Sequence, residues 1–195
     1  MNNEGAVTPE RAWPRVKWTR AAQAAALLDD AAAWEAVGAM SPAAAFGVVR
    51  ESDPAAATGF VAQCLPRIDA VRWMAACLAH ADANPPPARA VAAKAVRRWM
   101  ANPCDEARRL AYEAGQIAGW DTMEGLACLA IFLSGGSIAP AAQDVPVNPQ
   151  PGVFGKVVAG AVLAAAHAEG GAAFGGRIAA MLAKADAIAA GERPA

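Results

Sequence analysis

Apolar residues recur every three to four positions along most of this chain, which is the spacing of one face of an α-helix. The pattern is clearest in residues 88–140, where proline and glycine also mark helix ends, and we expect the rest of the chain to pack around that stretch. No segment has the alternation typical of a strand. The pattern therefore predicts an all-α fold of about eight or nine helices, either an irregular helical bundle or a short stack of helical hairpins.

Capping residues define where these helices begin and end. A serine, aspartate or asparagine directly before a proline is typical of a helix N-terminus. Gly119 and Gly135 are expected to end helices, Gly135 in the left-handed conformation. The first predicted helix covers residues 19–40, and the sequence further predicts helix starts at Ser41-Pro42, Asp53-Pro54, Pro66, Asn84-Pro85, Asn102-Pro103, Asp121 with Glu124, Val153 and Ala172.

The chain divides into three predicted parts. Residues 1–18 are polar and contain two prolines, which predicts an irregular N-terminal arm anchored by Trp13 and Trp18. Residues 19–191 form a single helical domain, and residues 192–195 form a frayed tail. Within the domain, the proline-rich connection at residues 138–152 is long, so we expect it to cross the surface or to serve a site.

Composition narrows the class of protein. The formal net charge of −1 disfavours a nucleic-acid partner, which would require a basic excess. The longest apolar runs, residues 126–133 and 157–166, are too short for a membrane span. The first residues lack the apolar run of a signal peptide, and the four cysteines lack CxxC spacing, which favours free thiols. We therefore expect a cytoplasmic protein with no membrane span.

Few residues are suited to catalysis. His80 and His167, the only histidines, lie on different predicted helices without other ligands at metal-binding spacing. Cys104 lies in the first turn of a helix, where the pKa of a thiol can fall. The sequence therefore predicts no catalytic site, metal or cofactor. An enzyme with its site under residues 138–152, using Cys104 or an acidic group, remains an alternative.

The segment Ser134-Gly135-Gly136-Ser137 could offer backbone amides to an anion. It follows the C-terminus of a predicted helix, however, and the partial negative charge there repels anions. We therefore interpret these four residues as a structural turn. We give Asn102 and Pro103 the same role between two helices.

The charged residues around that joint are the best candidates for binding a protein partner. We expect residues 105, 106, 108, 109 and 113 on the solvent side of their helix, with Arg109 within reach of both Glu106 and Glu113. They form either a self-paired solvated surface or a docking surface. Trp99 is expected in the core, but an exposed tryptophan beside arginines would be typical of an interface. The candidate docking residues are Arg97, Arg98, Trp99, Glu106, Arg108 and Arg109.

One further set of residues is distinctive by its order and spacing: Leu65-Pro66-Arg67, Ala70-Val71, Trp73, Ala95-Val96, Trp99, Pro103, Glu106, Arg108, Arg109, Leu129-Ala130, Phe132, Ser134 to Ser137, Pro140 and Val145-Pro146. In these residues the chain resembles an uncharacterised family of bacterial helical proteins often encoded near type VI secretion genes. The resemblance covers about residues 65–167 and brings no catalytic residues with it.

That resemblance implies an accessory role in secretion, with an effector or a spike component as partner. We therefore expect a non-enzymatic protein-interaction module, a cytoplasmic adaptor or chaperone-like accessory of a type VI secretion system. The alternative is a self-associating structural scaffold, suggested by the alanine-rich helix faces, which would make the protein a homo-oligomer.

Overall fold

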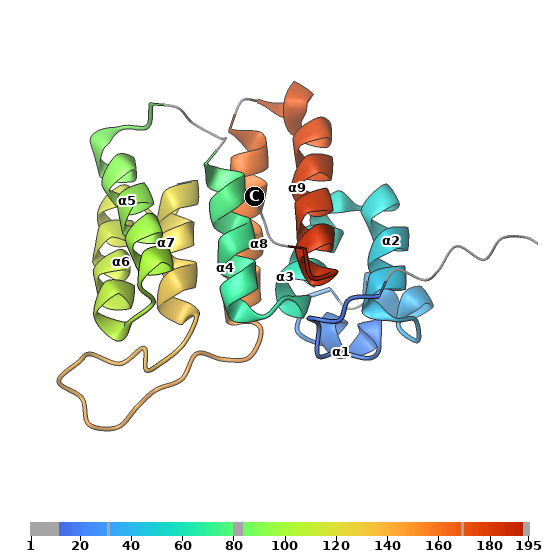
Figure 1. Cartoon of the computed structure of the whole chain (residues 1–195), viewed down its shortest axis with the longest axis horizontal. Helices are drawn as coiled ribbons and strands as arrows, with labels where there is room; N and C mark the ends of the chain where they lie inside the picture. Colours follow the sequence, from blue (N-terminus) through green and yellow to red (C-terminus); the bar gives the residue numbers. More distant parts are fainter. Residues whose placement is uncertain (1–11, 31, 80–83, 169, 193–195) are drawn as a thin grey trace, which may run out of the picture.

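The computed structural model describes residues 12–30, 32–79, 84–168 and 170–192, and these residues form helices and no strand (Figure 1). The all-α prediction is confirmed. The α-helices are α1 (Ala21–Ala25), α2 (Pro42–Ser52), α3 (Pro54–Cys64), α4 (Arg67–Leu78), α5 (Pro87–Ala101), α6 (Asp105–Ala118), α7 (Met123–Leu133), α8 (Val153–His167) and α9 (Phe174–Ala189), and the 3₁₀-helices are η1 (Ala32–Val37) and η2 (Gly171–Ala173).

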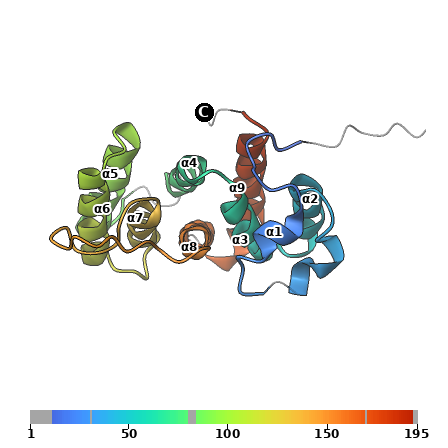
Figure 2. The ribbon, with the colours of Figure 1, turned by 90° about the horizontal axis from the view of Figure 1, so that it is seen from below.

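Helix α8 lies near the middle of an elongated row of helices, and packs on α3, α4, α7 and α9 (Figures 1 and 2). Its residues are apolar on most sides, which is typical of a helix surrounded by others. Helices α5, α6 and α7 form one end of the molecule, and α1 and α2 lie at the other. The expectation that the chain packs around residues 88–140 is therefore wrong, because α5 and α6 are apolar on one side only.

Several predicted helix starts are confirmed by their caps. Ser41 Oγ accepts a hydrogen bond from the amide of Ala44 at 3.3 Å, and Asp53 Oδ1 accepts one from Ala56 at 2.9 Å. In both cases the helix begins at the following proline, where the missing amide hydrogen costs nothing. Gly119 ends α6 with a φ of 90°, as expected.

The predicted single helix over residues 19–40 is wrong, since the chain there forms α1 and then η1. The amides of Ala21 and Ala22 donate to the carbonyls of Met40 and Gly38, at 2.9 and 3.0 Å. A continuous helix would carry residues 38 and 40 away from its own first turn. The folded-back segment instead buries Trp34, which stacks on Phe60 with 3.9 Å between ring centres.

Five predicted helix starts are displaced by one to three residues. Helix α4 begins at Arg67 instead of Pro66, and α9 begins at Phe174 instead of Ala172, after the 3₁₀-helix η2. Helix α5 begins at Pro87, because residues preceding a proline avoid the helical conformation and the three prolines 85–87 offer Asn84 no amide to accept from. Helix α6 begins at Asp105, where the Cys104 sulfur accepts from the amide of Ala107 at 3.5 Å. Helix α7 is capped by Thr122, and Glu124 turns inward instead of closing a capping box.

The described part of the N-terminal arm is fastened to the helices through its tryptophans. Trp13 Nε1 donates to Asp186 at 2.8 Å, and Trp18 Nε1 donates to the carbonyl of Gln63 at 3.1 Å. The expected anchoring is thus confirmed, while residues 1–11 of the arm and residues 193–195 of the tail lie outside the described residues.

Among the described residues, no single helix combines the length and the hydrophobicity that crossing a bilayer requires. Helices α8 and α9 meet those criteria only when taken together, with a bend of 110° between them.

Candidate protein-docking surface

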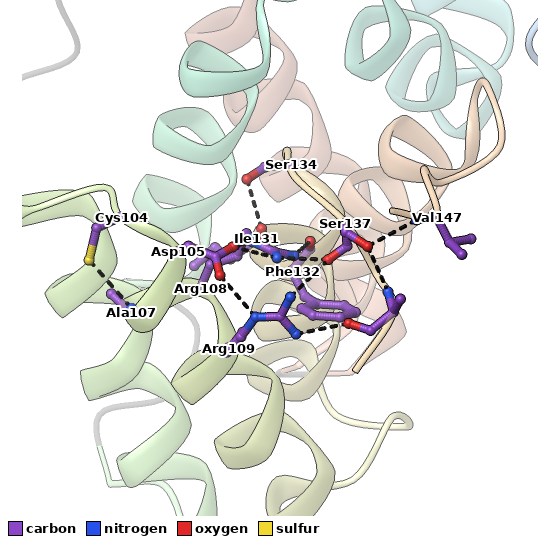
Figure 3. Close-up of polar contacts among 11 residues, drawn as sticks. Cys104, Asp105, Ala107, Arg108, Arg109, Ile131, Phe132, Ser134, Ser137 and Val147 are labelled. Atoms are coloured by element: carbon purple, nitrogen blue, oxygen red, sulfur yellow. Dashed lines mark hydrogen bonds and ion pairs between the residues drawn. The ribbon is translucent and has the colours of Figure 1, made fainter. Parts of the chain in front are cut away.

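Arg108 is buried, so the prediction that it lies on the solvent side of α6 is wrong. Its guanidinium donates from Nη1 to the carbonyl of Phe132 at 2.6 Å and from Nη2 to the carbonyl of Ser137 at 2.8 Å (Figure 3). The same group lies 4.7 Å above the Phe132 ring. A guanidinium can be buried because these acceptors replace the water that it loses.

Asp105 and Arg109 complete this cluster, which we call the Arg108 latch. Asp105 accepts from Arg108 at 2.6 and 2.8 Å and from Arg109 Nε at 2.9 Å. Arg109 also donates to the carbonyl of Ala139 at 3.0 Å. The predicted partners of Arg109, Glu106 and Glu113, are therefore replaced by Asp105. The latch joins the start of α6 to the segment that follows α7.

The turn after α7 has the structural role predicted for it. Ser134 ends the helix, its Oγ donating to the carbonyl of Ile131 at 2.7 Å. The left-handed residue is Gly136, with a φ of 68°, and not Gly135 as predicted. Ser137 Oγ accepts from the amides of Ala139 and Val147, at 3.1 and 2.9 Å, which closes the base of the proline-rich connection.

Arginine side chains of the chain itself donate to the carbonyls of this turn. The carbonyls at a helix C-terminus carry partial negative charge and point away from the helix. Here the carbonyl of Phe132 accepts from Arg108, and that of Ser134 accepts from Arg67 Nη1 at 2.8 Å. The carbonyl of Ser137, beyond the helix, accepts from Arg108 and Arg109. The rejection of an anion-binding site at residues 134–137 is thus consistent with the hydrogen bonds of the turn.

The remaining candidate docking residues are only partly brought together. Arg98 lies 3.9 Å from Glu106 across the joint between α5 and α6, and both side chains are exposed. Arg97 is exposed but lies towards α4, beside a pocket that Leu78 also lines. Trp99 is buried in the core, as expected. Asn102 and Pro103 form the exposed link between the two helices.

An exposed stripe on α6 was missed by the sequence analysis. Ile117 is 73% exposed and Leu110 is 37% exposed, although the helical spacing of apolar residues predicts both on one face with Ala107, Ala111 and Ala114. The buried side of α6 instead centres on its small residues and Arg108. A helical wheel with Gly115 and Arg108 on the buried side places residues 110 and 117 on the outer side of α6. It would therefore have predicted that these two residues are exposed.

Trp120 extends this stripe beyond the end of the helix. Its side chain is 38% exposed and contacts Tyr112 with 5.5 Å between ring centres. A Cβ added at Gly115 would lie 2.7 Å from the Trp120 ring, so the glycine leaves room for the indole to lie against α6. We call Leu110, Glu113, Ile117 and Trp120 the α6 stripe.

The Arg108 latch makes stability depend on pH. Hydrogen bonds from Arg108, and then from Arg109, hold the pKa of the Asp105 carboxyl below its ordinary value. Because the folded-state pKa is the lower one, the carboxylate stabilises the fold fully above the unfolded-state pKa of about 3.9. That contribution is lost as the pH falls through the folded-state pKa.

We therefore expect Asp105→Asn to have a lower free energy of unfolding than the wild type at neutral pH. The difference narrows below about pH 4, where the wild-type carboxyl takes up its proton. Urea unfolding of both proteins over a series of pH values measures it. A difference that is constant with pH would show that the charge of Asp105 plays no part.

The buried cysteines behave as core residues. Burial raises the pKa of the Cys77 and Cys128 thiols to about 12, and that of Cys64 still further above its ordinary range. The described cysteines are free thiols, as expected. Only Cys104 is exposed, as the cap of α6.

Of the two histidines, His167 is exposed at the end of α8 and stacks on Phe174 at 4.1 Å, while His80 lies outside the described residues. Across the ranges that the structure covers, no three or more His, Cys, Asp or Glu side chains gather in an arrangement that could hold a metal ion.

A pocket does lie beside the proline-rich connection, as the enzyme alternative requires. It has a volume of about 560 Å³ and is lined in part by residues 149–152. Neither Cys104 nor any described carboxylate lines it, and the thiol of its one cysteine, Cys64, has a raised pKa. The groups proposed for catalysis and the pocket proposed to contain them therefore do not coincide.

The sequence profile of a family of unknown function, DUF6931, matches residues 46–189. The matched span contains both the Arg108 latch and the α6 stripe, and it includes the residues 65–167 on which the resemblance rests. No curated protein and no solved structure matches the chain.

Proposed function

The chain belongs to DUF6931, a family of unknown function, and we propose that it is a non-enzymatic protein-interaction module that docks through the α6 stripe. In this proposal it serves as a cytoplasmic adaptor or chaperone-like accessory of a bacterial type VI secretion system. The resemblance of residues 65–167 to proteins encoded near such systems supports the biological setting. The exposed stripe supports the mode of action.

The observation that carries the proposal is the apolar surface at one end of the molecule. Leu110 and Ile117 are seven residues apart, so they lie on one side of α6, two turns from each other. Trp120 adds a partly exposed aromatic ring, a residue type enriched among the energetically important residues of interfaces. Helix α6 packs on α5 and α7, which leaves this side of it uncovered.

The charges beside the stripe indicate what occupies it. Glu113 lies between the two apolar residues, and Asp121 follows Trp120; both are exposed. Glu106 is matched by Arg98, so the excess charge along the stripe is negative. We therefore assign as occupant an amphipathic helix of a secretion component, with apolar residues three, four and seven apart and Lys or Arg beside them.

A second copy of the chain is the alternative occupant. Two α6 helices could pair through residues 110 and 117, since a spacing of seven is also that of a coiled-coil seam. In that case the protein would be the self-associating scaffold. Light scattering that shows a dimer in wild type and a monomer in Leu110→Glu/Ile117→Glu would favour it over a separate partner.

Loss of partner binding is the expected effect of the double change Leu110→Glu/Ile117→Glu. Two carboxylates would replace the apolar contacts and add to the negative charge, so recovery of the partner falls at least about tenfold. The measurement is affinity purification from cells that express the secretion system, with the secretion components quantified by mass spectrometry.

Val48→Glu is the matched control, because Val48 is 52% exposed on α2 at the other end of the molecule. It should recover the same component as the wild type. Circular dichroism of all three proteins should agree, since none of the three positions is buried. Equal recovery by the double variant, or no secretion component with the wild type, would refute the proposal.

A further inference from the structure

The pocket beside the proline-rich connection lies on a different part of the molecule from the α6 stripe. Three segments distant in sequence form it together with Leu27: the N-terminal arm at residues 15–18, the α3–α4 turn at residues 62–67, and residues 149–155. Its volume of about 560 Å³ lies within the range of pockets that bind small organic molecules.

The charged side chains that line this pocket are all cations. Arg15, Lys17 and Arg67 contribute to its wall, and no described carboxylate does. Arg15 is paired with Asp69 at 2.8 Å. Lys17 lies 4.3 Å above the Trp18 ring and Arg67 donates to a carbonyl, and neither contact cancels a charge. In a protein whose net charge is −1, this is a local positive excess.

Helices α4 and α8 both begin at the pocket, and α8 adds to this excess, whereas the first turn of α4 contains Asp69, the partner of Arg15. The residues before them, Pro66 and Gly152, provide no side-chain cap for the first-turn amides. Helix N-termini carry partial positive charge, so they favour an anion in the space in front of them.

Apart from Gln63 and Gln150, the other side chains of the wall are apolar. Trp18, Leu27, Leu65 and Phe154 contribute side chains to it. The Trp18 ring is fixed by the hydrogen bond from its Nε1 to the carbonyl of Gln63. A ligand that uses the whole pocket therefore combines a negative group with an apolar or aromatic body.

We propose that this pocket binds a small organic anion, a phosphate ester or a carboxylate that carries an apolar group. The anionic group lies among Lys17, Arg67 and the starts of α4 and α8, and the apolar part lies against Trp18 and Phe154. The proposal does not depend on the docking role of the α6 stripe.

Titration of the ¹⁵N-labelled full chain with phenyl phosphate tests it. The indole N–H of Trp18, identified with Trp18→Phe, reports on the pocket, and that of the buried Trp73 reports on the fold. We expect the chemical shift of the Trp18 indole N–H to change saturably with ligand concentration, and that of Trp73 to stay constant. Phenylacetate distinguishes a carboxylate site from a phosphate site, and binding of either compound supports the proposal.

The variant Lys17→Met changes an exposed residue and should weaken binding of phenyl phosphate. The double variant Lys17→Met/Arg67→Met should weaken it by about tenfold. Lys94→Met, which removes an exposed cation from α5, is the control and should bind as the wild type does. No saturable shift with either ligand would overturn the proposal. Equal weakening by Lys94→Met, or inorganic phosphate binding as tightly as phenyl phosphate, would also overturn it.

Discussion

Arg108→Ala is expected to lower the free energy of unfolding by about 3 kcal/mol, because a buried charged group with several partners is lost. The change removes the side-chain donor of the Phe132 carbonyl and leaves the Ser137 carbonyl with only the longer bond of 3.4 Å from Arg109. It also removes the cation above the Phe132 ring. Since Ser137 holds the base of the proline-rich connection, we expect that segment to exchange its amide hydrogens faster.

Urea unfolding and hydrogen exchange measure these two effects. Arg97→Ala is the control for removing an arginine from this region, and it should change stability by no more than about 0.5 kcal/mol because Arg97 is exposed. Arg108→Lys should fall between wild type and Arg108→Ala, because an ammonium keeps the charge but not the forked geometry. If Arg108→Ala were as stable as Arg97→Ala, the latch would have no structural role.

Gly125→Ala is the second change with a large expected effect, at least about 2 kcal/mol of destabilisation. In most helix interiors this substitution stabilises a protein, since alanine is the better helix former. At Gly125 the new Cβ would overlap the carbonyl oxygen of Gly119 and lie 2.9 Å from its carbonyl carbon. Backbone atoms cannot rotate away, so the turn that joins α6 to α7 must shift.

Gly47→Ala, in the interior of α2, is the matched control. An added Cβ there meets nothing within 4 Å, so helix propensity alone should stabilise the protein by about 0.5–1 kcal/mol. In thermal unfolding, the melting temperature should therefore rise for Gly47→Ala and fall for Gly125→Ala. A stabilised Gly125→Ala would mean that α6 and α7 do not approach as closely as the structure shows.

Local signals predicted the helices well because local interactions determine where a helix begins. Ser41 and Asp53 each precede a proline and cap the first turn, and no distant contact is needed. Prediction from the sequence failed where tertiary contacts determine the path of the chain. The amides of Ala21 and Ala22 bond to residues 38 and 40, and periodicity contains no information about such a pairing.

In the candidate site, too, tertiary contacts could not be predicted from the sequence. Spacing along α6 predicted Glu106 and Glu113 as partners of Arg109, whereas Asp105 is the carboxylate that pairs with it. Spacing also could not show that Arg108 has carbonyl acceptors 24 and 29 residues away. Arg108 therefore moved from the predicted surface into the interior, and Leu110 and Ile117 turned outward. Charge reversal at Arg108 and Arg109 consequently tests the latch, whereas changes in the α6 stripe test docking.

The most direct test of the docking proposal is a photo-reactive residue placed at position 113. This position lies between Leu110 and Ile117 on the exposed side of α6, and position 48 on α2 provides an exposed control. In cells that express the secretion system, we predict a cross-link from position 113 to one secretion component, and none to it from position 48. Equal cross-linking from both positions, or no adduct from position 113 in a folded protein, would contradict the account.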